Sequence, residues 1–325
     1  MKKFMAMTMA MVMTAMALTG CGGASTEDAA SGDIPVIGIN QYGQHASLDN
    51  CREGFLLGLE EAGLVEGVDF EIDYQNAGFD DNIATQIAQN FSANDVALMC
   101  AIATPSATAC YAAAEDKDIP VIFTAITDPE EAKLTGGNIT GTSDKLPIEG
   151  QLALIREMQP DAKTIGILYT TSEPNSVSAV AEYQEKAGDY GFTIEALGVM
   201  TQAEVNQATD TLISKGVDCF TNLTDNNVVG VLPSILEKTN EAGIPVYGSE
   251  IEQVKLGCVA SAGIEYIALG KQTGAMAAKI LKGEAAATDM PYETISEFEI
   301  YVNPDAMSAL SLNAAVENAI DVTAE

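Results

Sequence analysis

The chain has 325 residues, of which 47% are hydrophobic, and its 15 basic and 47 acidic side chains give a formal net charge of −32. Such an acidic body excludes nucleic acid and an anionic membrane surface as electrostatic partners. The length indicates two lobes rather than one compact domain.

The N-terminus predicts the export signal of a bacterial lipoprotein. Lys2 and Lys3 precede an uncharged run, residues 4–18, that is shorter than the roughly 20 apolar residues of a transmembrane helix. The run ends in Leu-Thr-Gly-Cys, which matches the lipobox, so we expect removal of residues 1–20 and a lipid on Cys21. Residues 21–33 are then a flexible tether. The alternative is an ordinary secreted protein with a chance cysteine at the cleavage site.

From residue 34 onward, β-branched runs alternate with amphipathic segments. Strands are expected at residues 35–40, 69–75, 96–102, 120–126, 164–169, 192–198, 217–223, 244–249, 257–263 and 293–303. Runs that are apolar on both faces are typical of parallel strands covered by helices. The tripeptide Ile-Pro-Val opens three of these strands, at 34–36, 119–121 and 244–246.

Helices are expected between the strands. Ser47 is the expected N-cap of the first helix, and Thr104 caps another with Pro105 at its first position. An aspartate caps a helix whose apolar stripe is Ile83, Ile87 and Phe91. Later, one helix ends at Gly283 and a closing helix spans 304–312.

The alternation predicts an α/β fold of two doubly wound parallel-sheet lobes. We expect residues 34–143 plus 257–287 in lobe 1 and residues 144–256 plus 288–325 in lobe 2. The chain then crosses between the lobes near residues 143, 256 and 288, and a ligand cleft lies between them.

Five further cysteines lie scattered in apolar runs, without Cys-x-x-Cys or Cys/His spacing for a metal. They are expected to be buried free thiols, with a Cys100–Cys110 bridge as the alternative. His45, the only histidine, is expected to be a hydrogen-bonding loop residue and not a catalyst.

Ligands of open α/β sheets bind outside the carboxyl ends of the strands, so the loops after the strands are the candidate site. These loops are rich in hydroxyls, amides and carboxylates and nearly devoid of Lys and Arg. Helix N-terminal amides with hydroxyls could hold a carboxylate, and acidic side chains could hold an amine, which together describe an amino-acid zwitterion. The hydroxyls are Thr104, Ser106 and Ser176, and the acids are Asp128, Asp225 and Glu250.

Each of these residues could equally be a helix cap or a solvated loop residue. Tyr42 and Phe79 lie in loops, where a stacking role is expected, whereas Tyr169 is expected in the core.

Seven motifs follow the lipobox in order: "IPVIGINQY", "ATPSAT", "PVIFTAITDP", "GGNITGTSD", "IGILYTTSEPNS", "NLTDNNV" and "IPVYGSE". Together they resemble the ABC-transporter substrate-binding lipoproteins of the tryptophan/tyrosine-binding type. The resemblance implies a type I periplasmic-binding-protein fold with a three-crossing hinge. It also implies a lipid-anchored protein on the extracytoplasmic face of the cell membrane, without catalysis or cofactor, that passes an amino acid, most readily Tyr, Trp or Phe, to an ABC permease and its ATPase.

The positions that match the motifs give the expected ligand-binding set. It comprises Gln41, Tyr42, Thr104, Ser106, Thr127, Asp128, Asn175, Ser176, Asp225, Asn226 and Glu250.

Other functions remain open from the sequence. A receptor for a sugar or nucleoside is one alternative, although the chain has no Trp and only two Arg for such a site. An enzyme is disfavoured because no Gly-x-Gly-x-x-Gly, Gly-x-Ser-x-Gly or P-loop motif is present. An added adhesin or sensor role is a third possibility.

Overall fold

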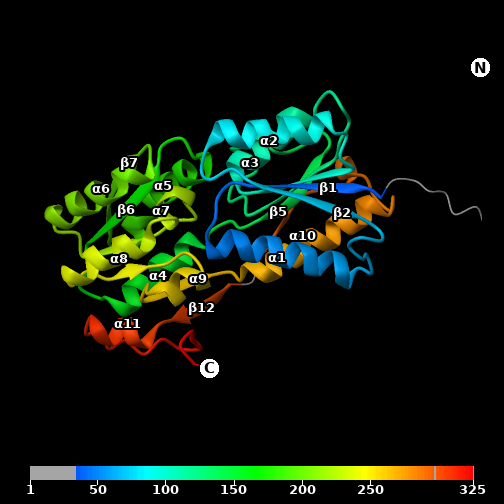
Figure 1. Ribbon diagram of the computed structural model, residues 1–325. Helices are drawn as coiled ribbons and strands as arrows, with labels where there is room; N and C mark the ends of the chain where they lie inside the picture. Colours follow the sequence, from blue (N-terminus) through cyan, green and yellow to red (C-terminus); the bar gives the residue numbers. More distant parts are fainter. Residues whose placement is uncertain (1–33, 296–297, 325) are drawn as a thin grey trace, which may run out of the picture. The chain divides into compact units, whose positions relative to one another are not determined.

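The computed structural model describes residues 34–295 and 298–324, so the export signal, Cys21 and the tether lie outside the described residues. Residues from Ile34 onward form one unit with three sheets, of which the six-stranded and the four-stranded sheet are each flanked by helices (Figure 1). Within the described ranges, none of the helices combines the length and apolarity needed to cross a membrane.

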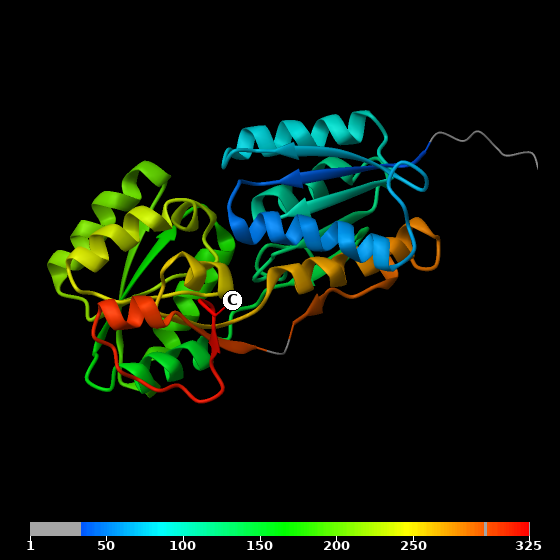
Figure 2. The same cartoon turned by 60° about the horizontal axis from the view of Figure 1, so that its bottom comes forward.

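Lobe 1 contains a six-stranded parallel sheet in the order β2-β1-β3-β4-β5-β11. Its strands are β1 (Val36–Gln41), β2 (Glu71–Asn76), β3 (Leu98–Ile102), β4 (Val121–Thr124), β5 (Ile139–Ser143) and β11 (Glu293–Thr294). Helices α2 (Asp81–Ala93) and α3 (Thr104–Ala114) cover one face, and α1 (Ala46–Glu61) and α10 (Tyr266–Leu281) cover the other (Figures 1 and 2). This is the doubly wound arrangement expected from the sequence.

Lobe 2 is built around the parallel strands β6 (Thr164–Thr170), β7 (Thr193–Val199), β8 (Cys219–Thr221) and β9 (Val246–Tyr247), in the order β7-β6-β8-β9. A separate three-stranded sheet lies beside β9, in the order β10 (Ala260–Gly263), β12 (Glu299–Val302) and β13 (Ile320–Asp321). The helices are α4 (Ile148–Met158), α5 (Pro174–Lys186), α6 (Gln202–Lys215), α7 (Asn226–Val229), α8 (Leu232–Glu241), α9 (Ile251–Leu256) and α11 (Pro304–Ala309). Two 3₁₀ turns are η1 (Ala187–Tyr190) in lobe 2 and η2 (Ala287–Asp289), next to β5.

The chain changes lobe after β5, between β10 and α10, and between β11 and β12. The second and third crossings differ from the expected positions near 256 and 288. Strand β10 belongs to lobe 2 because the amide of Val259 donates to the carbonyl of Val246 (2.8 Å) and β12 pairs with β10 along its other edge. Strand β11 belongs to lobe 1 because it pairs with β5. Sequence patterns did not show these pairings, since both strands are short.

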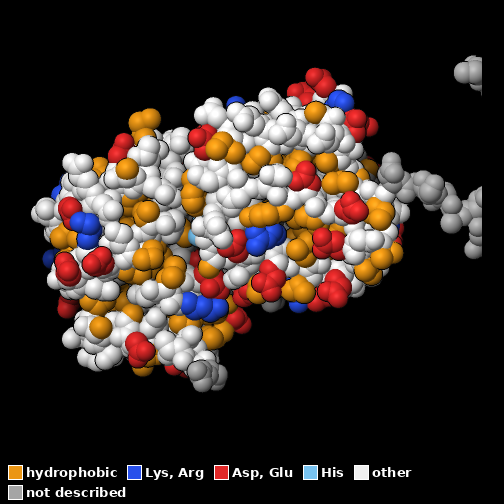
Figure 3. Space-filling model, viewed as in Figure 1, with side chains coloured by type: hydrophobic (Ala, Val, Ile, Leu, Met, Phe, Trp, Pro, Cys, Tyr) orange, Lys and Arg blue, Asp and Glu red, His pale blue; other side chains and the backbone are white. Residues whose placement is uncertain are grey.

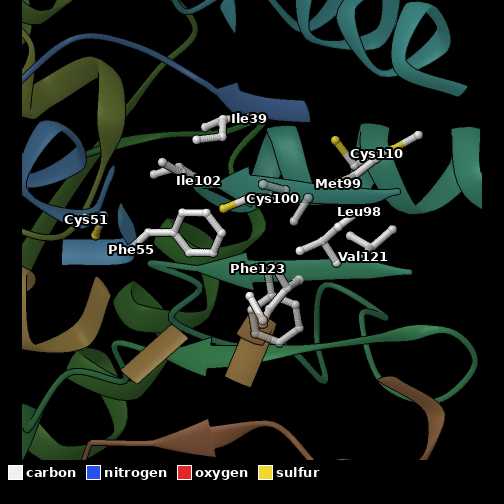
Figure 4. Packing of buried hydrophobic residues seen from close by; sticks show 14 of the residues in the cluster. Ile39, Cys51, Phe55, Leu98, Met99, Cys100, Ile102, Cys110, Val121 and Phe123 are labelled. Atoms are coloured by element: carbon white, nitrogen blue, oxygen red, sulfur yellow. The ribbon is translucent and has the colours of Figure 1, made fainter. Parts of the chain in front are cut away.

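The core of lobe 1 lies between its sheet and helices, where Phe55 from α1 and Phe123 from β4 lie among aliphatic and cysteine side chains (Figure 4). All five cysteines among the described residues are buried and free, as expected, and Cys100 and Cys110 form no bridge. Burial raises the pKa of the Cys110 thiol to about 12. These cysteines therefore act as small apolar side chains.

The three Ile-Pro-Val tripeptides do open strands, because β1, β4 and β9 each begin at the valine. The aspartate cap is confirmed: Asp80 accepts hydrogen bonds from the amides of Asn82 and Ile83. However, Ile83 is 43% exposed and does not join the expected buried stripe.

Two expected N-caps are wrong. Helix α1 begins at Ala46 with His45 as its N-cap, and the hydroxyl of Ser47 instead donates to Glu250 in lobe 2. Helix α3 begins at Thr104 itself, after Ala103 with a φ of 80°. Neither side chain caps its own helix: Ser47 bonds to the other lobe, and the hydroxyl of Thr104 has no partner.

Candidate functional site

The loops at the carboxyl ends of the strands bring the two lobes into contact. Three side-chain hydrogen bonds join them: Ser47 to Glu250 (3.1 Å), Thr127 to Thr224 (2.8 Å) and Ser178 to Asp128 (2.6 Å). The lobe boundary therefore lies where the sequence placed the ligand cleft.

An inner cavity lies at this boundary. Its volume is about 10 Å³, roughly the space that one water molecule needs. The lining residues are His45, Ser47, Leu48, Ala125, Asp144, Thr224, Asn226, Val229, Gln253 and Tyr266. A ligand larger than water enters only if the loops around this cavity move apart.

Two larger grooves, each of about 420 Å³, also border both lobes. The apolar groove is lined mainly by α2 and α3, with Thr104, Pro105, Thr108 and Ala109 on α3 and Ser172 and Pro174 from lobe 2. The polar groove is lined by Tyr42, Phe79, Asp80, Asp81, Asn82, Ser172, Met200, Gln202 and Asn227, among others. The grooves share Asp81 and Ser172, and each is large enough for an amino-acid-sized ligand.

The five predicted residues that border open space are distributed over these features. Tyr42 lines the polar groove, Thr104 the apolar groove and Asn226 the inner cavity. Thr127 and Asp128 line a further small cavity between the lobes. Thr104 is 2% exposed, and its hydroxyl has no hydrogen-bond partner, so it can donate a hydrogen bond to a ligand.

The other six predicted residues line none of these spaces. They are Gln41, Ser106, Asn175, Ser176, Asp225 and Glu250, and all are buried. Most of their polar atoms already have partners within the protein. Ser106, for example, donates to Asn40 (3.1 Å). In this structure these side chains support the loops, and one of them, Glu250, also joins the two lobes through Ser47.

Asp225 shows this support most clearly. Its carboxylate accepts hydrogen bonds from the amide and hydroxyl of Thr170, from the hydroxyl of Ser176 (2.7 Å) and from the amide of Val228 (2.9 Å). Burial raises the pKa of this carboxyl, and the hydrogen bonds oppose the rise. All four donors belong to lobe 2, so Asp225 fixes the loops of that lobe to one another.

Glu173 is a buried carboxylate that sequence reasoning missed. It is 1% exposed and accepts bonds from the backbone amide (3.2 Å) and side-chain amide (2.7 Å) of Asn226. Burial and the neighbouring charge of Asp225 raise the pKa of Glu173. Its position within the motif "YTTSEPNS" could have marked Glu173 as a residue of the site. An acidic loop residue before a proline is usually solvated, so the motif alone did not indicate burial.

Asp144 was also missed, although it lies in the motif "GGNITGTSD". It is 2% exposed and accepts hydrogen bonds from Thr127 (2.9 Å) and from the phenol of Tyr266 (2.6 Å). Burial raises the pKa of Asp144. Asp144 directly follows β5, whereas Tyr266 opens α10, which comes more than 100 residues later. The inner cavity therefore brings together residues that are far apart in the sequence.

Aromatic side chains are gathered beside these carboxylates. The rings of Tyr42 and Phe79 meet edge to face with centroids 5.9 Å apart, and His45 lies parallel to Phe79 at 6.3 Å. A Cβ atom on Gly230 of lobe 2 would lie 3.4 Å from Phe79, so this ring reaches across the lobe boundary. Phe79 also has a φ of 64°, a strained conformation of the kind found at ligand sites. Tyr169, by contrast, packs against the core of lobe 2 as expected.

The charges of the site suit a ligand with a cationic group. Among the described residues that line the inner cavity and the two grooves, none is Lys or Arg. Acidic side chains also outnumber basic ones over the surface in Figure 3. Within the described ranges, no group of three or more His, Cys, Asp or Glu side chains could hold a metal ion.

The comparisons with known proteins identify the family. Residues 36–325 match the family model described as "ABC transporter substrate binding protein". A "Tyrosine-binding protein" of Clostridioides difficile strain R20291 is 38% identical over 324 residues, covering 96% of this chain and 93% of that protein.

Two solved structures are similar over most of the chain. The ABC domain in complex with L-Trp from Streptococcus pneumoniae has 32% identity and a TM-score of 0.84, covering 88% of this chain and 99% of that one. The ligand-free, open structure of CD0873, a substrate-binding protein with adhesive properties from Clostridium difficile, has 38% identity and a TM-score of 0.67, covering 89% and 99%. The fold is thus that of the type I periplasmic binding proteins, as the resemblance implied. The chain belongs to the ABC transporter substrate-binding proteins, which capture small molecules outside the cytoplasm for an ABC transporter.

Proposed function

We propose that this protein captures an aromatic amino acid, Tyr, Trp or Phe, between its lobes and delivers it to an ABC permease. The observation that carries the proposal is the similarity over most of the chain to a domain solved with L-Trp. The relative named for tyrosine binding supports the same ligand class. A sugar or nucleoside receptor has less support, since the site lacks Trp and Arg.

Within the site, each part of the ligand has a complementary group. Tyr42 and Phe79 offer aromatic faces for the ligand ring. The unpartnered hydroxyl of Thr104 and the amides that open α3 suit the ligand carboxylate. Asp128 and Glu250 suit the amine, because each contacts the opposite lobe and becomes accessible when the lobes separate.

The small volume of the inner cavity supports a change between open and closed lobes for a ligand that reaches this cavity. The inner cavity has room for about one water molecule, and the structure superimposes less well on the open relative, with a TM-score of 0.67, than on the Trp complex, with a TM-score of 0.84. We propose that the three crossings act as the hinge and that ligand favours the closed form. X-ray scattering profiles that are identical with and without saturating ligand would contradict this.

The ligand class is tested by thermal unfolding with each of the twenty amino acids, and with ribose, glucose and nucleosides as controls. Ligand at 100 times its dissociation constant stabilises a protein by about 2.7 kcal/mol. Asp128→Asn and Glu250→Gln should weaken binding, whereas Asp305→Asn, on exposed α11, should not. A shift with a sugar or nucleoside but with no amino acid would overturn the ligand while leaving the family intact.

We also propose that Cys21 carries the lipid that holds the protein at the extracytoplasmic face of the membrane, and that the role is binding without catalysis. The lipobox and the names of the relatives support these two points. Cys21→Ser should release the protein from the membrane fraction or stall its processing. Unchanged lipid labelling of the variant would exclude Cys21.

A further inference from the structure

The only histidine of the chain has no hydrogen-bond partner in the structure. Both ring nitrogens of His45 are inaccessible to solvent, and neither makes a hydrogen bond of good geometry. His45 occupies the N-cap position of α1, yet its side chain does not cap the helix. A buried polar group without a partner costs about 1–3 kcal/mol, so neither capping nor local stability explains this side chain.

The surroundings of His45 combine an aromatic face with a small polar space. Its ring lies parallel to Phe79 (6.3 Å between centroids) and lines the inner cavity together with Asp144, Thr224 and Asn226. The cavity volume of about 10 Å³ is enough for one oxygen atom, and the hydroxyls and carboxylate around it are hydrogen-bonding groups.

The protonation state of His45 limits what it can bind. Burial lowers the pKa of His45 to about 4, with the nearby Asn226 amide and the Asp49 carboxylate opposing the change. The ring is therefore neutral at pH 7, with one nitrogen as a donor and the other as an acceptor. An ammonium group offers only donors and a carboxylate only acceptors, whereas a hydroxyl can pair with either nitrogen.

We propose that His45 binds the hydroxyl group of a phenolic ligand and so makes this receptor selective for tyrosine over phenylalanine. The proposal rests on the proposed function, since it assigns a specificity-determining residue to the same cleft. The phenol ring lies against Phe79 when the loops have moved apart to admit it, and its oxygen takes the place for which the inner cavity has room. A site with a buried polar group discriminates against a ligand that leaves that group without a partner.

The test compares tyrosine, phenylalanine and tryptophan by calorimetric titration of wild type, His45→Leu and His45→Gln. Wild type should prefer tyrosine to phenylalanine by about 10-fold or more. His45→Leu should weaken tyrosine binding by about 5–150-fold and leave phenylalanine binding nearly unchanged. His45→Gln retains a donor and an acceptor and should recover part of the preference. The melting temperature of ligand-free His45→Leu should not fall, because the variant removes a polar group that lacks a partner.

Three results would overturn the proposal. Equal binding of tyrosine and phenylalanine by wild type would show that the hydroxyl is not recognised, while leaving the proposed function intact. If His45→Leu weakens the binding of tyrosine and phenylalanine equally, His45 packs against the ring of either ligand and does not recognise the hydroxyl. If no amino acid binds and 4-hydroxyphenylpropionate is not preferred to phenylpropionate, both this inference and the proposed ligand class fail. A preference for 4-hydroxyphenylpropionate in that case would retain hydroxyl recognition by His45 and overturn only the amino-acid ligand.

Discussion

The contact between α1 and α10 gives the sharpest prediction about stability, because the two helices touch through glycines. Figures 1 and 2 show α10 lying along α1, although more than 200 residues separate the helices in the sequence. A Cβ atom on Gly270 would lie 2.3 Å from the carbonyl oxygen of Cys51 and 2.8 Å from the amide nitrogen of Phe55. Gly54, Gly58 and Gly274 meet backbone atoms equally closely. Gly270→Ala therefore forces the helices apart.

The expected cost follows from two opposing effects. Overpacking a core costs about 1–3 kcal/mol, and the upper end applies here because the opposing atoms are backbone and cannot rotate away. Alanine favours the helix over glycine by about 1 kcal/mol. The net loss is about 2 kcal/mol, which lowers the melting temperature by about 4–8 °C in a protein of this size.

Thermal unfolding followed by circular dichroism measures this change. The matched control is Gly188→Ala in the 3₁₀ turn η1, where an added Cβ atom meets no heavy atom within 4 Å. The control should melt at or slightly above the wild-type temperature. A Gly270→Ala variant as stable as wild type would show that the helices are not held together by this close contact.

Two further predictions concern the buried carboxylates. Burial raises the pKa of Glu250 from 4.5 to about 7, so the folded state binds more protons than the unfolded state between these values. The stability that Glu250 contributes is therefore present at low pH and falls as pH rises from about 4.5 to about 7, by up to about 3 kcal/mol. Urea unfolding at pH 4.5 and pH 8 should show a smaller pH-dependent loss in Glu250→Gln than in wild type, and identical losses would contradict the assignment. Asp225→Asn should lower the free energy of unfolding by about 1–3 kcal/mol, since one amide oxygen cannot satisfy the four donors that the carboxylate serves. Exposed Asp305→Asn is its control, and equal stability of the two variants would refute the role of Asp225.

The sequence predicted the sheets well because their strands carry local signals. The Ile-Pro-Val starts of β1, β4 and β9 are visible in the residues themselves. Strand β5 was missed because "ITGTS" is polar, although all five residues are buried. The lobe assignment of β10 and β11 could not be predicted, since it depends on which distant backbone each short strand pairs with.

The candidate site was predicted at the level of loops and only partly at the level of side chains. The motifs identified the loops that meet at the lobe boundary, because parallel strands end at one edge of each sheet. Whether a given acid faces the cleft or its own lobe depends on its rotamer and on its neighbours. Asp225 and Asp144 follow strands in similar motifs, but Asp225 is bonded within lobe 2 whereas Asp144 borders the inner cavity.

Buried polar atoms that lack hydrogen-bond partners are concentrated at the cleft, and this observation does not depend on any sequence motif. Among the described residues, seven buried side-chain polar atoms in six residues have no partner. Four of these residues, His45, Thr104, Asn175 and Gln202, lie at the starts of α1, α3, α5 and α6, which follow β1, β3, β6 and β7. The buried carboxylates nearby are, in contrast, supplied with donors from their own loops. Polar atoms left without partners destabilise the protein alone, and a ligand that pairs with them recovers that free energy on binding.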